Sequence, residues 1–479
     1  MTEVLERERK WEVDDDFVLP SLDDIIPGDE VEHSTIELTS AYFDTADRDL
    51  SAHGLLLRRR EGDDDAGWQL KMPDSNGRIE IRYPSADTMP SDLSALLTGV
   101  NLGKQLVNVA TIHTTRKRYR ITDPTSHQLV AEIADDHVCA TVDEGGTGKP
   151  IRWREVEVEL GPAADEVPRK LAKRLASAGA KPPRYPSKLA RVAAVSSTED
   201  RSAHAGKAEE ALARYMHAQI EQIFQGDVGL RRGQDPIHDT RVAIRRLRST
   251  LRVFGTLLDQ SAIEGVEEEL RWFATLIGAV RDCQVQRRRF TTALNELPAE
   301  LVLGPVASRI DTELQSVERP ARDRVSDAMD SPRYLDILKT LRRWSTQPPI
   351  AAPVSAEALY KQVRRAKRKA DRRLAAGIAA GDDALLHRAR KAAKRARYAA
   401  ELVEPLNKGK RVRNTIKHYE EIQTVLGELQ DTVVARNTLL RLATKAGTTP
   451  GENGFTYGLL YANELRQGEA ARREARHLA

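Results

Sequence analysis

Cysteine, aromatic residues and long apolar stretches are all scarce in this chain. Only Cys139 and Cys283 are cysteines among 479 residues, so no disulfide framework is available and a reducing cytoplasm is favoured. No apolar run is long enough to cross a bilayer, and the first residues are too polar for a signal peptide. Aromatic residues make up 5% of the chain, which leaves few platforms for stacking bases. We expect a cytoplasmic protein with no membrane partner.

Charge is abundant, and its sign differs between the two halves of the chain. Charged residues make up 31% of the sequence, and the net charge is +3. Residues 1–200 carry 26 Lys and Arg against 37 Asp and Glu, whereas residues 201–479 carry 49 against 35. This asymmetry predicts two domains with different electrostatic roles, and the basic one should attract polyanions.

In the first half, charged residues alternate with apolar ones along the segments that we predict to be strands. Strand side chains point to opposite faces with a period of two, which places Glu6, Glu8 and Lys10 on one face. A solvated face of an antiparallel sheet is the simpler interpretation. However, acids gather on the first strand and around 132–159, and bases gather between 58 and 118. If the sheet closes into a barrel, these faces can line a lumen that holds a metal and an anion. The predicted strands cover residues 5–11, 35–43, 55–60, 67–71, 77–83, 114–121, 129–142 and 154–160.

These motifs, in this order, resemble the CYTH domain, also called the triphosphate tunnel metalloenzyme fold. The resemblance covers roughly residues 3–195 and rests on the Glu-x-Glu-x-Lys start, Arg58-x-Arg60, the Arg116/Arg118 strand and Ser187-Lys188. It implies an eight-stranded antiparallel β-tunnel over residues 1–195 that binds triphosphate substrates with Mg²⁺ or Mn²⁺. The implied metal ligands are Glu6, Glu8, Asp136, Glu155, Glu157 and Glu159. The implied phosphate-binding residues are Lys10, Arg58, Arg60, Lys71, Arg116, Arg118 and Lys188. The implied catalytic set is Glu6, Glu8, Lys10, Glu157 and Glu159.

Elementary chemistry agrees with this implication. Phosphoryl transfer depends mostly on positioning and on charge neutralisation, for which clustered Arg and Lys with a metal are suitable. Glu80 and Glu132 are open to two interpretations. They either orient neighbouring Arg or Lys side chains or form ordinary salt bridges.

The second half is predicted to be helical and to contain an internal repeat. Residues 196–206 are polar and aperiodic, which indicates a linker, and helical patterns begin at 207. His238 recurs as His387, and Gly278 recurs as Gly427, with an offset of 149 in both cases. The constant offset predicts two halves of similar size, at about 207–345 and 355–479.

Each half carries a stripe of cations on one helix face. Helical spacing aligns residues at offsets of 0, 3, 7 and 10. The first stripe is His238, Arg241, Arg245 and Arg248, and the second stripe is His387, Arg390, Lys394 and Arg397. A core histidine and a solvated arginine face are the ordinary interpretations, but a matched pair of stripes without acids favours binding of an external polyanion.

This half resembles the CHAD domain, the conserved-histidine α-helical family, over roughly residues 205–475. The resemblance implies two pseudo-symmetric four-helix bundles with a basic groove, formed by the two stripes, that binds inorganic polyphosphate. A further basic run between Arg364 and Arg373 either extends this groove or is a solvated face, and we favour the latter. Asp282 and Asp431 are expected to brace basic residues or to cap helices.

The sequence therefore predicts an α+β multidomain enzyme. We expect metal-dependent hydrolysis of inorganic triphosphate or a related short phosphate chain in the tunnel, with polyphosphate held by the helical half. The alternatives are an adenylate cyclase, a thiamine triphosphatase and a non-catalytic polyphosphate scaffold. Specific nucleic-acid binding is disfavoured because no base-reading module is visible. We expect a cytoplasmic location that includes polyphosphate granules, and the sequence leaves the oligomeric state open.

Overall fold

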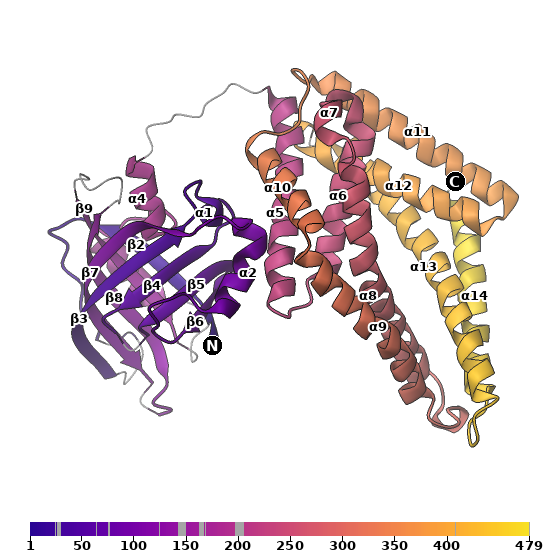
Figure 1. Cartoon of the computed structure of the whole chain (residues 1–479), viewed down its shortest axis with the longest axis horizontal. Helices are drawn as coiled ribbons and strands as arrows, with labels where there is room; N and C mark the ends of the chain where they lie inside the picture. The colour runs from indigo at the N-terminus through magenta and orange to yellow at the C-terminus, as the bar shows by residue number, and fades with distance from the viewer. Residues whose placement is uncertain are drawn as a thin grey trace. The chain divides into compact units, whose positions relative to one another are not determined.

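The computed structural model of the chain divides into two compact units, Met1–Ser202 and Ala203–Ala479 (Figure 1). The structure describes all residues except 24, 26–29, 64, 75–76, 124, 142–149, 162–166, 168, 197–205, 408 and 479. The linker predicted at 196–206 falls at the division, and all of it except Ser196 and Gly206 lies outside the described residues. None of the helices in the described part of the chain has the length and hydrophobicity that crossing a bilayer requires.

The first unit is built on one antiparallel sheet. The strands are β1 (Thr2–Glu6), β2 (Glu8–Val13), β3 (Glu30–Asp44), β4 (Leu56–Glu61), β5 (Gly67–Asp74), β6 (Gly77–Tyr83), β7 (Val107–Thr122), β8 (Leu129–Thr141) and β9 (Ile151–Leu160). Their order in the sheet is β1-β6-β5-β4-β3-β7-β8-β9-β2. The predicted α+β layout, with an N-terminal antiparallel sheet and a helical C-terminal part, is confirmed.

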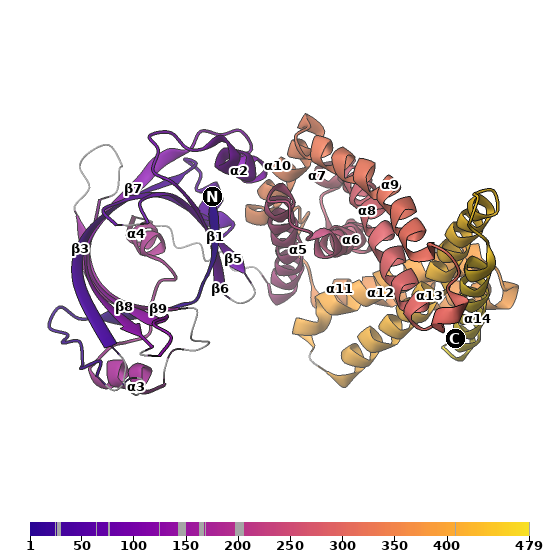
Figure 2. The same cartoon turned by 90° about the horizontal axis from the view of Figure 1, so that it is seen from below.

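The first predicted strand is divided at Arg7, so the sheet has nine strands where eight were expected. β1 pairs with β6, whereas β2 pairs with β9 at the other end of the sheet order. Because one residue joins β1 to β2, the two ends of the order are neighbours along the chain, and the sheet curves round on itself (Figure 2). The division leaves Glu6 and Glu8 facing the same interior.

Apolar side chains cover the outside of the curved sheet. Trp11 and Val13 from β2 pack with Val156 and Val158 from β9 and with Leu171 of α3 (Arg169–Ser177). The alternate positions of the same strands therefore point inward, which explains why the interior is charged. The remaining helices of this unit are α1 (Asp49–Ala52), α2 (Ser91–Asn101) and α4 (Lys188–Ser196).

α4 lies within the outline of the curved sheet in Figure 2. Its Leu189 and Val192 pack against a small apolar cluster that includes Ile112 and Val138 on the sheet. This packing fixes the first residue of the helix, Lys188, which projects into the charged interior.

The second unit is helical. Its helices are α5 (Lys207–Arg231), α6 (Ile237–Phe254), α7 (Gln260–Ile263), α8 (Val266–Asn295), α9 (Val306–Met329), α10 (Pro332–Thr346), α11 (Ala356–Ala380), α12 (Asp383–Val403), α13 (Lys410–Ala446) and α14 (Phe455–His477). Short 3₁₀ turns occupy Gly255–Leu257, Ala299–Leu301 and Glu404–Leu406.

The predicted repeat appears as matched helices. α5 begins at Lys207 and α11 at Ala356, and α9 begins at Val306 and α14 at Phe455, so both pairs keep the offset of 149. The two sets of four are α5, α6, α8 and α9, and α11, α12, α13 and α14. They contact each other where α6 meets α12 and where α8 and α9 share a core cluster with α13 and α14. α10 falls between the repeats in sequence and packs against α5, α8 and α9.

Candidate functional site

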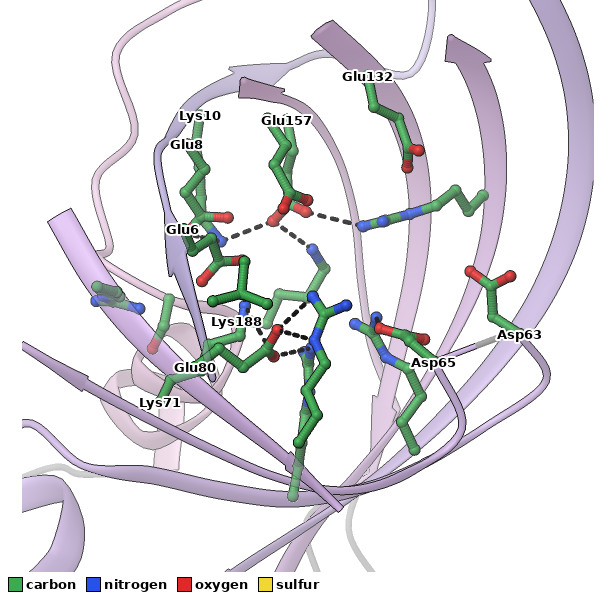
Figure 3. A pocket seen from close by; sticks show the side chains of 18 of the residues that line it. Glu6, Glu8, Lys10, Asp63, Asp65, Lys71, Glu80, Glu132, Glu157 and Lys188 are labelled. Atoms are coloured by element: carbon green, nitrogen blue, oxygen red, sulfur yellow. Dashed lines mark hydrogen bonds and ion pairs between the residues drawn. The ribbon is translucent and has the colours of Figure 1, made fainter. Parts of the chain in front are cut away.

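The curved sheet encloses a charged cavity of about 350 Å³, the inner cavity (Figure 3). The basic residues that line it are Lys10, Arg58, Arg60, Lys71, Arg78, Arg82, Arg116, Arg118, Arg120 and Lys188. The acidic residues that line it are Glu6, Glu8, Asp63, Asp65, Glu80, Glu132, Glu157 and Glu159. Charges of both signs in a concave site suit a polyanion that binds together with a cation.

One wall of the cavity comes from β4, β5 and β6, and Glu80 is at its centre. Arg58 Nη2 lies 3.3 Å from Glu80 Oε1, and Lys71 Nζ lies 3.7 Å from the same oxygen. Burial opposes ionisation of Glu80, but Lys71 and Arg58 outweigh it and lower the pKa of this carboxyl to about 2. Glu80 is therefore an anionic brace that holds two phosphate-binding candidates in place.

Two aspartates from the loop after β4 reach the next cations. Asp65 Oδ2 accepts a hydrogen bond of 2.9 Å from Arg60 Nη1, and Asp63 lies 3.3 Å from Arg118 Nη1. Neither acid is among the predicted site residues, because a loop has no strand period that would indicate where its side chains point. Charge alternation in the strands is the signal that would have added Arg78, Arg82 and Arg120.

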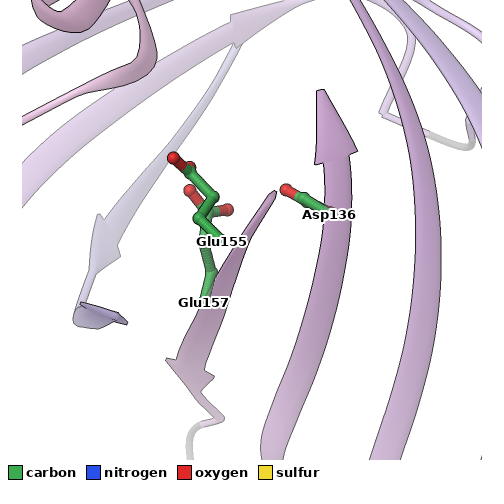
Figure 4. A group of neighbouring side chains, drawn as sticks. All are labelled: Asp136, Glu155 and Glu157. Carbon is green, nitrogen blue, oxygen red and sulfur yellow. The ribbon is translucent and has the colours of Figure 1, made fainter. Parts of the chain in front are cut away.

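Lys188 lies among three carboxylates on the opposite wall. Its Nζ is 2.9 Å from Asp136 Oδ2, 2.7 Å from Glu155 Oε1 and 2.7 Å from Glu157 Oε1. Oxygens of these acids lie within 4.8 Å of one another, which is compact enough to hold a metal ion (Figure 4). The ammonium of Lys188 currently supplies the positive charge at their centre.

Glu157 is the most heavily engaged acid of this group. It accepts hydrogen bonds from Lys10 Nζ at 2.7 Å and from Arg116 Nη2 at 2.8 Å, in addition to the bond from Lys188. Although burial opposes its charge, these three cations hold the pKa of Glu157 well below its usual range. Burial likewise opposes the charge on Lys188, but its acidic neighbours keep the pKa of the ammonium well above its usual range.

A second group of acids, from β1, β2 and β9, includes an oxygen without a partner and a carboxyl that resists ionisation. Within the described residues, Glu6 Oε2 is buried without a hydrogen-bond partner, whereas Glu6 Oε1 contacts Lys71 Nζ at 2.5 Å. Burial, and then the neighbouring Glu6, raise the pKa of Glu159 to about 7. The β2–β9 register places Glu8 directly opposite Glu159. An orphaned carboxylate oxygen beside a carboxyl that resists ionisation is a suitable arrangement for a hard divalent cation.

The structure thus brings the predicted tunnel residues together. All of them line the inner cavity except Asp136 and Glu155, which lie behind Lys188. Tyr42 also faces the cavity; although burial opposes its ionisation, Arg58 and Lys188 lower the pKa of its phenol.

In the helical unit, each stripe places an arginine against a glycine of a neighbouring helix. The guanidinium of Arg241 on α6 passes over Gly278 on α8, and that of Arg390 on α12 passes over Gly427 on α13. Arg241 Nη1 lies 2.8 Å from Asp282 Oδ1, which agrees with the bracing role expected for this aspartate. Packing of the stripes thus explains why glycine recurs at the offset of 149.

The ends of the stripes have acidic partners that the sequence did not indicate. Arg248 Nη2 lies 2.7 Å from Glu267, and Arg397 Nε lies 2.9 Å from Glu401. Arg245 Nε donates a 2.9 Å hydrogen bond to Tyr398 Oη, which links the first stripe to α12, the helix that carries the second stripe. The like-charge repulsion expected along the stripes is therefore relieved at these ends.

Repulsion persists at the centre of the stripes. Burial, followed by the charges of Arg390, Arg245 and Arg241, lowers the pKa of Lys394 to about 6. Burial and nearby cations also lower the pKa values of His238 and His387. Asp282 beside Arg241 and Asp431 near Arg390 do not offset this repulsion, which favours binding of a further anion.

Comparisons with known proteins agree with both units. The CYTH domain family matches residues 5–191, and the CHAD domain family matches residues 214–440. An uncharacterized protein found in two strains of Mycobacterium tuberculosis is 35% identical over 503 residues, covering 98% of this chain and 94% of its own length.

Two solved structures resemble part of this chain. PptA from Streptomyces chartreusis is 23% identical, with a TM-score of 0.47, covering 56% of this chain and 98% of its own. The CHAD domain from the plant Ricinus communis is 26% identical, with a TM-score of 0.47, covering 57% of this chain and 92% of its own. The matches over residues 5–191 and 214–440, together with the full-length relative, show that this chain belongs to the proteins in which a CYTH domain is followed by a CHAD domain.

Proposed function

We propose that the CYTH unit hydrolyses inorganic triphosphate, or a related short phosphate chain, with Mg²⁺ or Mn²⁺, and that the CHAD unit binds polyphosphate. The observation that supports the first part is the inner cavity, where ten basic and eight acidic side chains face one enclosed space. The repeated pair of cation stripes supports the second part.

In this proposal the phosphates bind to the cations of the inner cavity. Arg58, Arg60 and Lys71 come from β4 and β5, and Arg116 and Arg118 come from β7. A substrate between these strands is contacted from two sides, so its phosphates are held in line and their charge is neutralised. Lys10 and Lys188 reach the same space from β2 and α4, where each can exchange a carboxylate partner for a phosphate oxygen.

The acids of the inner cavity are suitable for the metal. Glu6, with its unpartnered oxygen, and Glu159, whose carboxyl resists ionisation, are the first candidates. Glu8 lies opposite Glu159 and can join them by exchanging Lys10, now 3.3 Å away, for the metal. Asp136, Glu155 and Glu157 can hold an ion only when Lys188 turns away from them, for example toward a bound phosphate. When bound, the metal supplies charge neutralisation and polarises a phosphoryl oxygen or a water molecule.

The lining of the cavity favours an inorganic phosphate chain over a nucleotide. Among the described residues that line it, Tyr42 is the one aromatic side chain, and it is buried in the wall. A cyclase acting on ATP needs a surface that recognises adenine, and no second aromatic platform is at hand here. An enzyme acting on thiamine triphosphate likewise needs a surface that recognises the thiamine group.

A substrate panel tests this proposal. Phosphate release is measured from triphosphate, ATP, thiamine triphosphate and long-chain polyphosphate, with Mg²⁺ and then with Mn²⁺, and cyclic AMP formation is followed in parallel. We expect triphosphate to give the highest kcat/KM. Preferred turnover of thiamine triphosphate, or production of cyclic AMP, would assign the cavity to one of the alternatives.

A binding measurement tests the CHAD unit separately. Arg241→Gln and Arg390→Gln together remove one cation from each stripe, and we expect weaker binding of polyphosphate with unchanged turnover of triphosphate. Binding that stays unchanged would place the polyphosphate site elsewhere.

A further inference from the structure

A second basic cavity, separate from the inner cavity, lies in the CHAD unit. It has a volume of about 830 Å³ and is formed by the end of α6 together with α11 and α12. Six of the eleven residues that line it are cationic: Arg252, Arg365, Arg368, Lys369, Arg372 and Arg395. None of the described lining residues is acidic, and we call this site the basic cavity.

The cations of the basic cavity are poorly neutralised. Arg252 Nε has a partner at 2.7 Å in Glu267, whereas the other five form no ion pair with any described residue. Burial and neighbouring arginines lower the pKa values of Lys369 and Arg395. Like charges gathered around a hollow without acids are unfavourable unless an anion occupies it.

The internal repeat provides a comparison, because positions 149 residues apart correspond, and the site equivalent to the basic cavity is therefore formed by the end of α12 with α5 and α6. Glu401 is the counterpart of Arg252, and Arg246 is the counterpart of Arg395. At the equivalent site Glu401 Oε2, from α12, lies 3.2 Å from Arg246 Nη2 on α6 and 3.2 Å from Tyr215 Oη on α5, so the arginine there is already neutralised.

The difference extends along the first helix of each repeat. Met216 and Ile220 of α5 are buried, whereas their counterparts Arg365 and Lys369 on α11 are exposed. The same structural position is thus a closed apolar contact in one repeat and an open cationic cavity in the other. Three arginines of the basic run on α11 line a cavity that has no acidic wall, which favours a binding role over the solvated face expected from the sequence.

We propose that the basic cavity is a second site for an inorganic phosphate chain, and that it makes the CHAD unit prefer long chains. The first stripe leads directly to it, because Arg248 and Arg252 are one turn apart on α6 and both bond to Glu267. A chain long enough to contact the stripes and the basic cavity together gains affinity through multivalency. The preference for long chains rests on the polyphosphate binding proposed for the stripes, whereas occupation of the basic cavity does not.

The wall of the basic cavity favours this ligand over single-stranded nucleic acid. Its described lining contains no aromatic side chain, and its non-cationic members are Val253, Thr256, Gln362, Ala366 and Ala392. Binding of single strands relies on bases that stack on aromatic rings, for which nothing is provided here. Repeated phosphate groups, by contrast, need only closely spaced cations.

Binding of long and short polyphosphate to the full chain tests the proposal. The variant combines Arg365→Gln, Arg368→Gln and Arg372→Gln, which are exposed positions where folding should be unaffected. The control combines Arg466→Gln, Arg473→Gln and Arg476→Gln on α14, which removes the same charge from exposed positions outside the basic cavity. We expect the variant to bind the long chain about tenfold more weakly, and the short chain within about twofold of the wild type. The slope of log K against log salt for the long chain should also fall by about two.

Each other outcome counts against the proposal. Equal binding of the long chain by the variant and the α14 control would overturn it, and so would a preference of the wild type for an RNA oligonucleotide that the variant loses. The proposed function is tested by separate measurements. Arg241→Gln with Arg390→Gln tests polyphosphate binding by the stripes, and phosphate release tests hydrolysis in the inner cavity. If the stripes lose polyphosphate binding while the basic cavity still binds it, the proposal for the basic cavity stands independently of the proposal for the stripes.

Discussion

The guanidinium of Arg390 lies over Gly427, so that a Cβ at residue 427 would be 3.0 Å from Nη2 of the arginine. Arg241 and Gly278 repeat this relationship in the first half, where the corresponding distance is 3.3 Å. In both halves the absence of a side chain on one helix positions a cation of the stripe on the next. The glycines therefore belong to the proposed polyphosphate-binding surface although they carry no charge.

Gly427→Ala should displace Arg390 and weaken polyphosphate binding by a few-fold. Gly458→Ala on α14 is the matched control, because no atom lies within 4 Å of the Cβ it would add. Alanine in a helix interior favours the helix by up to about 1 kcal/mol, so the control should be neutral or stabilising. Isothermal titration with polyphosphate distinguishes the two variants, and equal affinities would refute the positioning role.

Glu157→Gln should destabilise the CYTH unit and make its stability depend on triphosphate. The change leaves Lys10, Arg116 and Lys188 close together without their shared carboxylate. Removing one partner of a buried ion network costs about 3–5 kcal/mol. Thermal unfolding should show a lower Tm that added triphosphate raises more in the variant than in the wild type. A Tm equal to that of the wild type would mean that this network is not under electrostatic strain.

Metal affinity should rise with pH through about 7 because of Glu159. Its pKa of about 7 leaves the carboxyl protonated at lower pH, and the protonated form is a poor ligand. Mn²⁺ binding followed by electron paramagnetic resonance between pH 6 and 8 should therefore strengthen in the wild type. Glu159→Gln should bind more weakly and lose this pH dependence. If the slope persists in the variant, another group controls it.

Polyphosphate binding at pH 7.5 should take up about one proton at Lys394. This lysine has a folded-state pKa of about 6, below its ordinary value of 10.5, and faces Arg390, Arg245, Arg241 and Asp431. It is thus mostly neutral at pH 7.5, and a bound polyanion restores its charge. In the absence of ligand the unfolded chain binds the extra proton between these pKa values, so Lys394 costs stability as the pH falls from 10.5 toward 6.

Calorimetry in buffers of different ionisation enthalpy measures this uptake. On binding polyphosphate, Lys394→Met should take up about one proton fewer than the wild type, whereas Lys417→Met, at an exposed position, should take up the same number as the wild type. His238 contributes equally to all three proteins, whereas burial and nearby cations, Lys394 among them, lower the pKa of His387, so the difference reports Lys394 together with its effect on His387. The same uptake in all three proteins would contradict the assignment.

Strand phase, together with the resemblance to the CYTH domain, predicted most of the charged residues that line the inner cavity. Lys10, Arg58 and Lys188 meet although they are far apart in the sequence, because each is fixed by a periodic element or by a short motif. Loop residues such as Asp63 have no such constraint, and sequence analysis could not place them. The division of the first strand at Arg7 also left no trace in the pattern, because Glu6 and Glu8 keep the same phase on either side of it.

Ion-pair partners that depend on packing between helices could not be predicted from the sequence either. Nothing in the spacing of α6 indicates that Glu267 of α8 would reach Arg248. The repeat pattern likewise showed that the halves match, but not that Glu401 neutralises one site while Arg252 leaves its counterpart cationic. Such differences arise from side chains that meet only in the folded unit.

The central claim is that the inner cavity is a working triphosphatase, and phosphate release from triphosphate by wild type, Glu6→Gln and Glu3→Gln tests it most directly. Glu6 lines the cavity with an orphaned oxygen, whereas Glu3 is exposed on the same strand. The account predicts metal-dependent release by the wild type and by Glu3→Gln, with kcat lowered by about 10²-fold or more in Glu6→Gln. Release that is equal in all three proteins, or absent from all three with Mg²⁺ and with Mn²⁺, would contradict it.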